Sequence, residues 1–329
     1  MPSIGEAGLR KLSNVSKDIW RYRINARIRE EAYDILRKRE RPNLEDAVKR
    51  GLMILAVDHP ARMNFSVGND KYALLDRGRL LTKVFAALML DEVDGILLTA
   101  DILDELLILA EMVENELDMP LKKYLGKKII IGSINRGGLS GSIFELDDRV
   151  TVFRPSDIAK LGLDGAKFLL RIDLSDDRTL NALTYAHEIS RECSDLKLPL
   201  FIEVFPVRKA NNGYAVIDDP YELAAVVNVV SGLGYSTFNR FLKLPFTRNF
   251  QIVAKSTTLP IMMLGGGSGD SGEFIKNVKE ALLAGNNVVG VVAGRNILFP
   301  SDSEMEDVIK KLRSIIDYAM KNKEVTNDN

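Results

Sequence analysis

Short, almost continuously apolar runs recur along the chain and are separated by segments long enough for one or two helices. A run that is apolar at nearly every position is typical of a strand buried on both faces of a parallel sheet. The pattern therefore predicts eight strands, at residues 52–58, 94–100, 127–134, 166–173, 198–206, 239–246, 259–265 and 288–294.

Helical periodicity fills the segments between these runs. Residues 175–196 read as one helix, and residues 271–285 as another that begins at Ser271, with Glu273 in its first turn. Eight strands that alternate with helices over about 250 residues predict a single α/β domain of the (β/α)8 TIM barrel type. The competing interpretation is an open doubly wound sheet, but no G-x-G-x-x-G follows the first run and eight units fit closure better.

Two segments fall outside this alternation. Residues 1–50 are highly charged and helical in pattern, so we expect a helical N-terminal extension there and a catalytic barrel over residues 51–329. The extension either pads the bottom of the barrel, covers an edge of the active site or packs in an oligomer. The glycine-bearing stretch 135–150 is expected as a long loop on the face where barrel enzymes carry their active sites.

Composition narrows the class of protein. The 45 Lys and Arg residues nearly balance the 46 Asp and Glu residues, which gives no positive field for binding nucleic acid. One cysteine and two histidines exclude an internal disulfide and make a His/Cys metal cluster improbable. No apolar run approaches the roughly 18 residues that a membrane span needs, and the N-terminus lacks a hydrophobic signal core. We therefore expect a cytoplasmic protein without a membrane partner.

The candidate site residues are the polar and glycine residues that follow or end the predicted strands. In a barrel, side chains at the carboxyl ends of the strands converge on one site. This set combines acids, bases and groups that suit a phosphate, without a metal cluster: Asp58, Lys167, Arg171, Glu203, Lys243, Gly265, Gly266, Gly267, Ser268, Gly294 and Arg295.

Lys243 is unusual because it lies inside the apolar run RFLKLPF. Strand periodicity places Phe241 and Lys243 on one face, so both point into the barrel if Phe241 does. Burial disfavours a charged ammonium and so frees an amine to attack carbonyl groups, and a second cation such as Lys167 adds to this effect. The alternative for either lysine is a structural ion pair with Glu203 or Asp58.

The two acids also allow two interpretations each. Asp58 follows a buried strand, where it either shuttles protons and orients a hydroxyl group or caps the following turn. Glu203 stands between apolar residues and acts either in catalysis or as the partner of an inward lysine. His59 is expected only to support its loop, and His187 to lie on a helix surface.

Glycines near the end of the chain indicate an anion site. The sequence GGGS at 265–268 follows the seventh predicted strand, and Gly294 with Arg295 follows the eighth. Glycine lets the backbone approach an anion closely with its N–H groups free to donate. Loops after strands seven and eight often bind phosphate in this fold, so we prefer this interpretation to a flexible surface loop.

These motifs together resemble the class I, Schiff-base aldolases of the (β/α)8 type. The nearest patterns are those of tagatose-bisphosphate aldolase and of archaeal-type class I fructose-bisphosphate aldolases. The resemblance runs in order through about residues 50–300, in the segments ILAVDHPAR (54–62), GAKFLLRIDL (165–174), LPLFIEVFP (198–206), FLKLPF (241–246), LPIMMLGGGS (259–268) and AGNNVVGVVAGRN (284–296).

The resemblance implies roles for individual residues. Lys243 matches the Schiff-base lysine, Asp58 the acid of the first strand, and Lys167 the fourth-strand lysine of the tagatose enzymes. The phosphate-binding turns of the family match Gly266, Gly267, Gly294 and Arg295. The chain departs from the family at Phe205, where archaeal fructose-bisphosphate aldolases have a tyrosine as proton donor. It also has SINRGGLSG after the third strand in place of an acidic-basic pair.

The expected function is the cleavage or formation of a C–C bond in a phosphorylated ketose or keto sugar acid, without metal or cofactor. Lys243 forms the Schiff base, Asp58 or Glu203 transfers protons, and Arg171 positions anionic or hydroxyl groups. The sugar phosphate is the expected partner, and the resemblance implies a homo-oligomer. The scarcity of histidine disfavours a metal-dependent class II aldolase.

Two alternatives stay open. One is another Schiff-base barrel enzyme: a deoxysugar-phosphate aldolase, a transaldolase-like enzyme or an acyl-transferring enzyme. The other is a non-catalytic sugar-phosphate sensor, which would gain nothing from an unpaired lysine inside the barrel.

Overall fold

Eight parallel strands close into a barrel in the computed structural model, which describes residues 6–24, 26–117, 125–136, 138–211, 213–267 and 270–327. Strands β1 to β4 run in sequence order around the sheet, and the pairing of β4 with β5 closes it. The strands are β1 (Leu52–Ala56), β2 (Gly95–Leu98), β3 (Ile129–Ser133), β4 (Gly165–Ile172), β5 (Leu200–Lys209), β7 (Arg240–Leu244), β8 (Ile261–Leu264) and β9 (Val288–Ala293). The (β/α)8 barrel predicted from the sequence is therefore confirmed.

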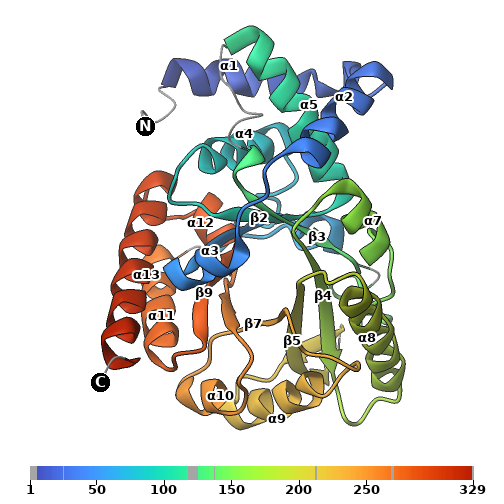
Figure 1. Ribbon diagram of the computed structural model, residues 1–329, viewed down its shortest axis with the longest axis vertical. Coiled ribbons are helices and arrows are strands. Elements are labelled where there is room, and N and C mark those ends of the chain that lie inside the picture. The colour runs from blue at the N-terminus through green and yellow to red at the C-terminus, as the bar shows by residue number, and fades with distance from the viewer. Residues whose placement is uncertain are drawn as a thin grey trace.

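Helices surround the barrel and bury its outer face (Figure 1). They are α4 (Arg77–Leu88), α5 (Ala100–Leu117), α7 (Pro155–Leu161), α8 (Arg178–Asp195), α9 (Pro220–Ser231), α10 (Gln251–Lys255), α11 (Ser271–Leu283), α12 (Arg295–Leu298) and α13 (Met305–Asn327). α11 begins at Ser271, as the sequence predicted, and its N-cap is Asp270, whose carboxylate accepts the backbone N–H of Glu273. Among the helices that the structure describes, no candidate membrane span is found.

The interior of the barrel is packed with apolar side chains in its lower part. Phe201 of β5 and Phe241 of β7 are partners in the strand register, and their rings stack with centroids 4.6 Å apart. Both belong to the inner cluster of buried residues, whereas Leu242 and Leu244 belong to the outer one. Phe241 therefore faces the interior, as expected, and strand periodicity places Lys243 on the same inner side.

The helices that precede β1 take two different positions. α1 (Glu6–Lys17) and α2 (Ala26–Lys38), joined by the short helix η1 (Ile19–Arg21), lie outside the barrel against α4 and α5 (Figure 1). α3 (Leu44–Arg50) covers the amino-terminal end of the barrel, where Leu44 and Val48 pack against the inner apolar cluster. Three roles were considered for residues 1–50, and α3 has the first of them, because it covers the bottom of the barrel.

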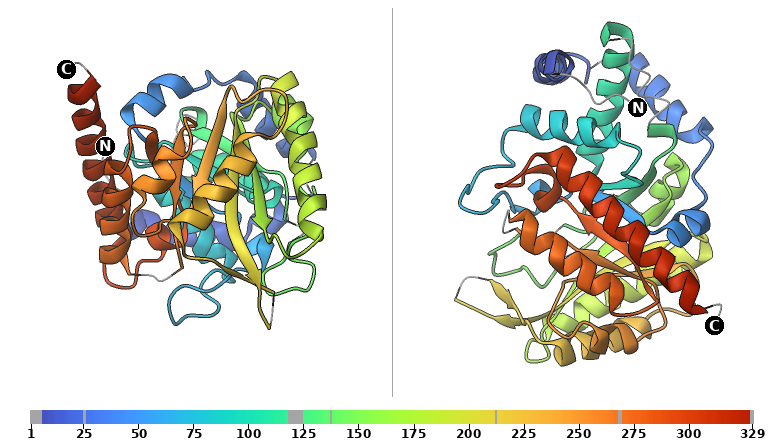
Figure 2. Two further views of the ribbon diagram at one scale, coloured as in Figure 1. Left: turned by 90° about the horizontal axis from the view of Figure 1, so that it is seen from below. Right: turned by 90° about the vertical axis from the view of Figure 1, so that its left-hand side faces the viewer.

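The opposite end of the barrel carries a hairpin that the sequence did not predict. β5 continues to Lys209, beyond its register with the neighbouring barrel strands, and pairs in antiparallel fashion with β6 (Tyr214–Val216). Figure 2 shows this hairpin projecting from the barrel. Together with the loop after β3, it forms one wall of the cavity at this end.

Candidate functional site

A cavity of about 320 Å³ opens at the carboxyl ends of the barrel strands. Its walls come from strand ends, from the loop after β3 and from the β5–β6 hairpin. The lining includes seven of the predicted site residues, namely Asp58, Lys167, Arg171, Glu203, Gly265, Gly266 and Arg295. The structure thus brings residues that are more than 200 positions apart in the sequence into one place.

Four buried charged side chains form a continuous row at this cavity, and of the four only Lys243 is not part of the cavity lining. Lys167 Nζ lies 2.8 Å from Asp58 Oδ2 and 2.6 Å from Glu203 Oε2. The other oxygen of the same glutamate, Oε1, lies 2.8 Å from Lys243 Nζ. All four residues are at most 6% exposed. We call this row the Asp58–Lys243 relay.

The structure bears on the alternatives that the sequence left open for Asp58, Glu203 and Lys243. Asp58 does not cap the following turn, since the N-cap of η2 (Pro60–Arg62) is His59 and no side-chain cap is formed. Glu203 is the partner of two lysines at once. The assumption that Lys243 lies unpaired was wrong, because an ammonium group buried this deeply is stabilised by a counter-charge.

The lysines keep both carboxylates of the relay ionised. Burial by itself raises the pKa of Glu203, but the charges of Lys167 and Lys243 outweigh burial and lower this pKa to about 2. Burial also raises the pKa of Asp58, but the charges of Lys167 and Lys243 again outweigh burial and hold this pKa well below its usual value. Burial lowers the pKa of Lys167 despite its two acidic neighbours. The resting site therefore holds both carboxylates in their ionised form.

Arg295 lies at the start of α12, on the side of the cavity where β8 and β9 end. Its Nη1 donates to Asn64 Oδ1 at 2.7 Å and to the Ser66 carbonyl oxygen at 3.1 Å. It forms no ion pair with a carboxylate in the part of the chain that the structure describes. A guanidinium group whose protein partners are all neutral retains its charge for an anionic ligand.

The glycine turn after β8 lies beside this arginine. A Cβ atom at Gly267 would lie 2.7 Å from Arg295 Nη1, whereas a Cβ atom at Gly266 would meet nothing within 4 Å. The Gly68 N–H donates to the Gly267 carbonyl oxygen at 2.8 Å, which ties the turn to the loop after β1. Ser268, the last residue of the predicted GGGS turn, lies outside the described residues.

Gly294 does not line the cavity. A Cβ atom at this position would lie only 1.9 Å from the Ala56 carbonyl oxygen. The glycine therefore permits the close approach of the ends of β1 and β9, and the structure gives no support for the contact with phosphate that the sequence indicated.

The opposite wall contains buried charges that the sequence did not assign. Arg171 Nη2 lies 3.0 Å from Glu145 Oε1, and its Nη1 lies 3.5 Å from Asp148 Oδ2. Arg62 Nη1 lies 2.7 Å from the same oxygen of Asp148. Glu145 and Asp148 belong to the loop 135–150, which was expected on this face, but nothing in its sequence distinguishes these two acids from their exposed neighbours.

His59 and Asn64 are two further lining residues that sequence reasoning missed or set aside. Burial, together with the nearby charge of Arg295, lowers the pKa of His59 to about 3, so its ring is neutral near pH 7. Asn64 holds Arg295, as described above. Its position in the loop after β1 carries no sequence signal, since only the closed barrel brings it next to the end of β9.

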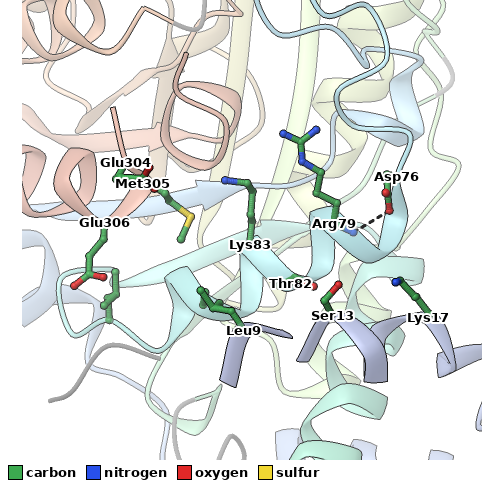
Figure 3. A pocket seen from close by; sticks show the side chains of 12 residues that line it. Leu9, Ser13, Lys17, Asp76, Arg79, Thr82, Lys83, Glu304, Met305 and Glu306 are labelled. Carbon is green, nitrogen blue, oxygen red and sulfur yellow. Dashed lines mark hydrogen bonds between the residues drawn. The ribbon is translucent and has the colours of Figure 1, made fainter. Parts of the chain in front are cut away.

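A second cleft, of about 530 Å³, lies outside the barrel between α1, α4 and α13 (Figure 3). Its cations Lys17, Arg79 and Lys83 are matched in number by acids that also line it, Asp76, Glu304 and Glu306. None of the candidate site residues contributes to it. The barrel mouth contains the buried relay and also Arg295, which pairs with no acid in the described part of the chain, so it is the candidate active site.

Comparison with known proteins places this chain in a family. A family model described as Cgl0159-like matches residues 50–312. The chain belongs to this family. A crystal structure of Cgl0159 from Corynebacterium glutamicum (Brevibacterium flavum) is 31% identical and has a TM-score of 0.81, covering 91% of this chain and 96% of that one.

The fold is shared with aldolases at lower identity. The crystal structure of an archaeal fructose 1,6-bisphosphate aldolase is 20% identical, with a TM-score of 0.56 over 83% of this chain and 96% of that one. Among curated proteins, 2-amino-3,7-dideoxy-D-threo-hept-6-ulosonate synthase 1 from Archaeoglobus fulgidus is 28% identical over 179 residues, which is 54% of this chain and 62% of that protein. The chain thus matches less than two thirds of the length of this relative. The predicted likeness to aldolase-type barrels is confirmed.

Proposed function

We propose that this protein is a class I aldolase that cleaves or forms a C–C bond of a phosphorylated ketose or keto sugar acid through a Schiff base on Lys243. The observation that carries the proposal is the Asp58–Lys243 relay at a cavity whose other side holds Arg295, which forms no ion pair with any acid among the described residues. The relay supplies a nucleophile and proton acceptors, and Arg295 supplies a site for a phosphate group.

The first step requires a neutral amine. Glu203 Oε1, 2.8 Å from Lys243 Nζ, is the proton acceptor we assign to this lysine. The freed amine attacks the ketone carbon of the substrate and forms a carbinolamine. Loss of water, with a proton returned to the departing hydroxyl group, gives the iminium ion.

The iminium ion makes the C–C bond cleavable because it accepts the bonding electrons. Asp58 or Glu203 takes the proton from the hydroxyl group of the departing half, which leaves as an aldehyde while the ketone half becomes an enamine. Return of that proton to the enamine carbon, followed by hydrolysis, releases the second product and Lys243. Lys167 holds both carboxylates in place by its two ion pairs.

The phosphate group of the substrate is assigned to the side of Arg295 and Gly266. Gly266 lines the cavity and leaves open space where a side chain would begin. Arg295 is fixed by Asn64 and Ser66, so its remaining donors are oriented before the ligand arrives. Binding of this remote group orients the reacting carbon against Lys243.

A half-reaction tests this proposal without knowledge of the aldehyde. An aldolase that forms an enamine exchanges a carbon-bound hydrogen of dihydroxyacetone phosphate with solvent. We expect deuterium incorporation in D2O with EDTA present, because the iminium replaces a metal as the electron sink. Lys243→Met removes the nucleophile and is expected to lower the exchange rate by at least a thousandfold.

The matched control is Lys255→Met, which removes an exposed lysine on α10 and is expected to leave exchange unchanged. Exchange that survives in Lys243→Met, or that EDTA abolishes, contradicts the proposal. Absence of exchange in the folded wild-type protein favours the sensor alternative. The sequence argued against a sensor because a sensor would gain nothing from an unpaired lysine inside the barrel. Lys243 is paired with Glu203, so this argument no longer applies and the exchange experiment has to distinguish an enzyme from a sensor.

A further inference from the structure

The cations around the cavity differ in how fully the protein neutralises them. Lys167, Lys243, Arg62 and Arg171 each form at least one ion pair with a buried carboxylate. Arg295 instead donates to an amide oxygen and a backbone carbonyl oxygen. Among the cavity residues that the structure describes, the charge available to an anionic ligand is therefore concentrated at Arg295.

The wall opposite Arg295 is electrically balanced. Its two arginines, Arg62 and Arg171, face the two carboxylates of Glu145 and Asp148. The side chains of these four residues are at most 12% exposed, so water screens them little. A phosphate group brought here would meet two carboxylates, and the arginines that would bind it are already neutralised.

Glu145 is also held in place by backbone groups. Its Oε2 accepts from the N–H of Gly141 at 3.2 Å and from the N–H of Tyr214 at 3.3 Å. These donors belong to the loop after β3 and to the β5–β6 hairpin, so both segments fix the carboxylate against Arg171. Glu145 cannot swing away to free Arg171 without breaking these contacts.

Apart from Ser140, the remaining lining of this wall is uncharged and largely apolar. Leu169, Phe205 and Val216 line the cavity together with Tyr214. The phenol of Tyr214 donates to Asp176 at 2.6 Å and so already has a partner within the protein. An uncharged molecular half fits such a wall, because it loses little hydration energy there and makes apolar contacts.

We propose that the substrate of this site carries a single phosphate group, on the ketone half that binds beside Arg295, and that the aldehyde half facing Glu145 and Arg171 is uncharged. The assignment of the two halves rests on the proposed function, whereas the preference for one phosphate rests on the charge balance alone. The proposal separates this protein from an enzyme for a sugar bisphosphate.

The test compares two ligands that cannot form a Schiff base. Hexitol 1-phosphate and hexitol 1,6-bisphosphate, made by reduction of the ketoses, are titrated into the wild-type protein and measured by calorimetry. We expect the monophosphate to bind at least as tightly as the bisphosphate. A bisphosphate that binds tenfold or more tightly, or a monophosphate that does not bind, overturns the proposal.

A variant tests the cause of the preference. Glu145→Gln keeps the size of the side chain but removes its charge, which leaves Arg171 with Asp148 as its remaining acid. We expect bisphosphate affinity to rise at least fivefold while monophosphate affinity stays within twofold. Asp148→Asn is the second variant, should the first unfold, and Glu188→Gln on the exposed face of α8 is the control.

Failure of this proposal is distinguishable from failure of the aldolase proposal. Binding of hexitol phosphates requires no amine chemistry, so a preference for the monophosphate stands even if deuterium exchange is absent. Conversely, exchange dependent on Lys243 together with tenfold tighter bisphosphate binding retains the aldolase and rejects the single phosphate. If Glu145→Gln and the wild type bind the bisphosphate equally well, the charge of Glu145 is not the cause of the preference for a single phosphate, and that explanation is rejected.

Discussion

His59 illustrates how the environment of one residue sets its chemistry. The ring lines the cavity next to the relay, and burial together with Arg295 holds its pKa at about 3. The same side chain titrates near 6.5 in an unfolded chain. Between these two values the unfolded state binds a proton that the folded state does not, so the contribution of this group to stability falls as pH falls from 6.5 towards 3.

The prediction compares the pH dependence of unfolding in two variants. By about pH 4.5, wild-type protein is expected to have lost on the order of 2 kcal/mol of stability through His59. In His59→Gln this part of the loss disappears, whereas His187→Gln, which changes an exposed histidine on α8, keeps the wild-type slope. Urea unfolding at a series of pH values measures both slopes. Equal slopes for His59→Gln and wild type would contradict the assignment.

The candidate residues that the sequence could predict share a simple property. Asp58, Lys167, Glu203 and Lys243 are charged residues in or directly after apolar runs, and a barrel brings such positions together. Glu145, Asn64 and Tyr214 belong to loops or to a short hairpin, where no periodicity fixes the direction of a side chain. Their roles depend on contacts between distant segments, such as the one between Asn64 and Arg295.

At the scale of elements, the barrel depends on glycines that allow neighbouring strands to approach. A Cβ atom at Gly95 of β2 would lie 2.2 Å from the Ile129 carbonyl oxygen in β3 and 2.8 Å from Ile129 Cβ. Backbone atoms cannot move aside as a flexible side chain can. Gly95→Ala must therefore displace β2 from β3 in their paired region.

We expect Gly95→Ala to reduce the free energy of unfolding by about 1–3 kcal/mol, the range typical of overpacked sites. Gly266→Ala is the matched control, because a Cβ atom there meets nothing within 4 Å. Its stability should equal that of the wild type. Urea unfolding of both variants makes the comparison, and a Gly95→Ala protein as stable as the control would show that the strands tolerate the displacement.

Element prediction succeeded where hydrophobic runs were long and failed where they were short. Each of the eight predicted barrel strands corresponds to an observed one, because burial on both faces leaves a nearly continuous apolar signature. Strand β6 has only three residues, Tyr214–Val216, which are too few to show a period. The start of α11 at Ser271 was predicted correctly, because polar and acidic residues typical of a helix N-terminus mark it.

In the whole molecule, apolar packing fills one end of the barrel, and the candidate active site lies at the other end. α3 and the inner apolar cluster fill the amino-terminal end, and the Asp58–Lys243 relay lies towards the carboxyl-terminal end. α1 and α2 attach to the outside of the barrel through contacts with α4 and α5, and Arg39, which follows α2, forms a buried ion pair with Asp164 at 2.5 Å. Charge patterns alone did not reveal this attachment, because the acid lies 125 positions away in the sequence.

Borohydride reduction in the presence of dihydroxyacetone phosphate shows whether Lys243 forms a Schiff base with a ketose phosphate. Reduction converts an iminium ion into a stable secondary amine, and mass mapping of peptides then identifies the lysine that carries it. We expect an adduct of the mass of the reduced ligand on the peptide that contains Lys243. An adduct on Lys167 instead, or none on folded protein with any ketose phosphate, would contradict the assignment of Lys243 as the Schiff-base lysine.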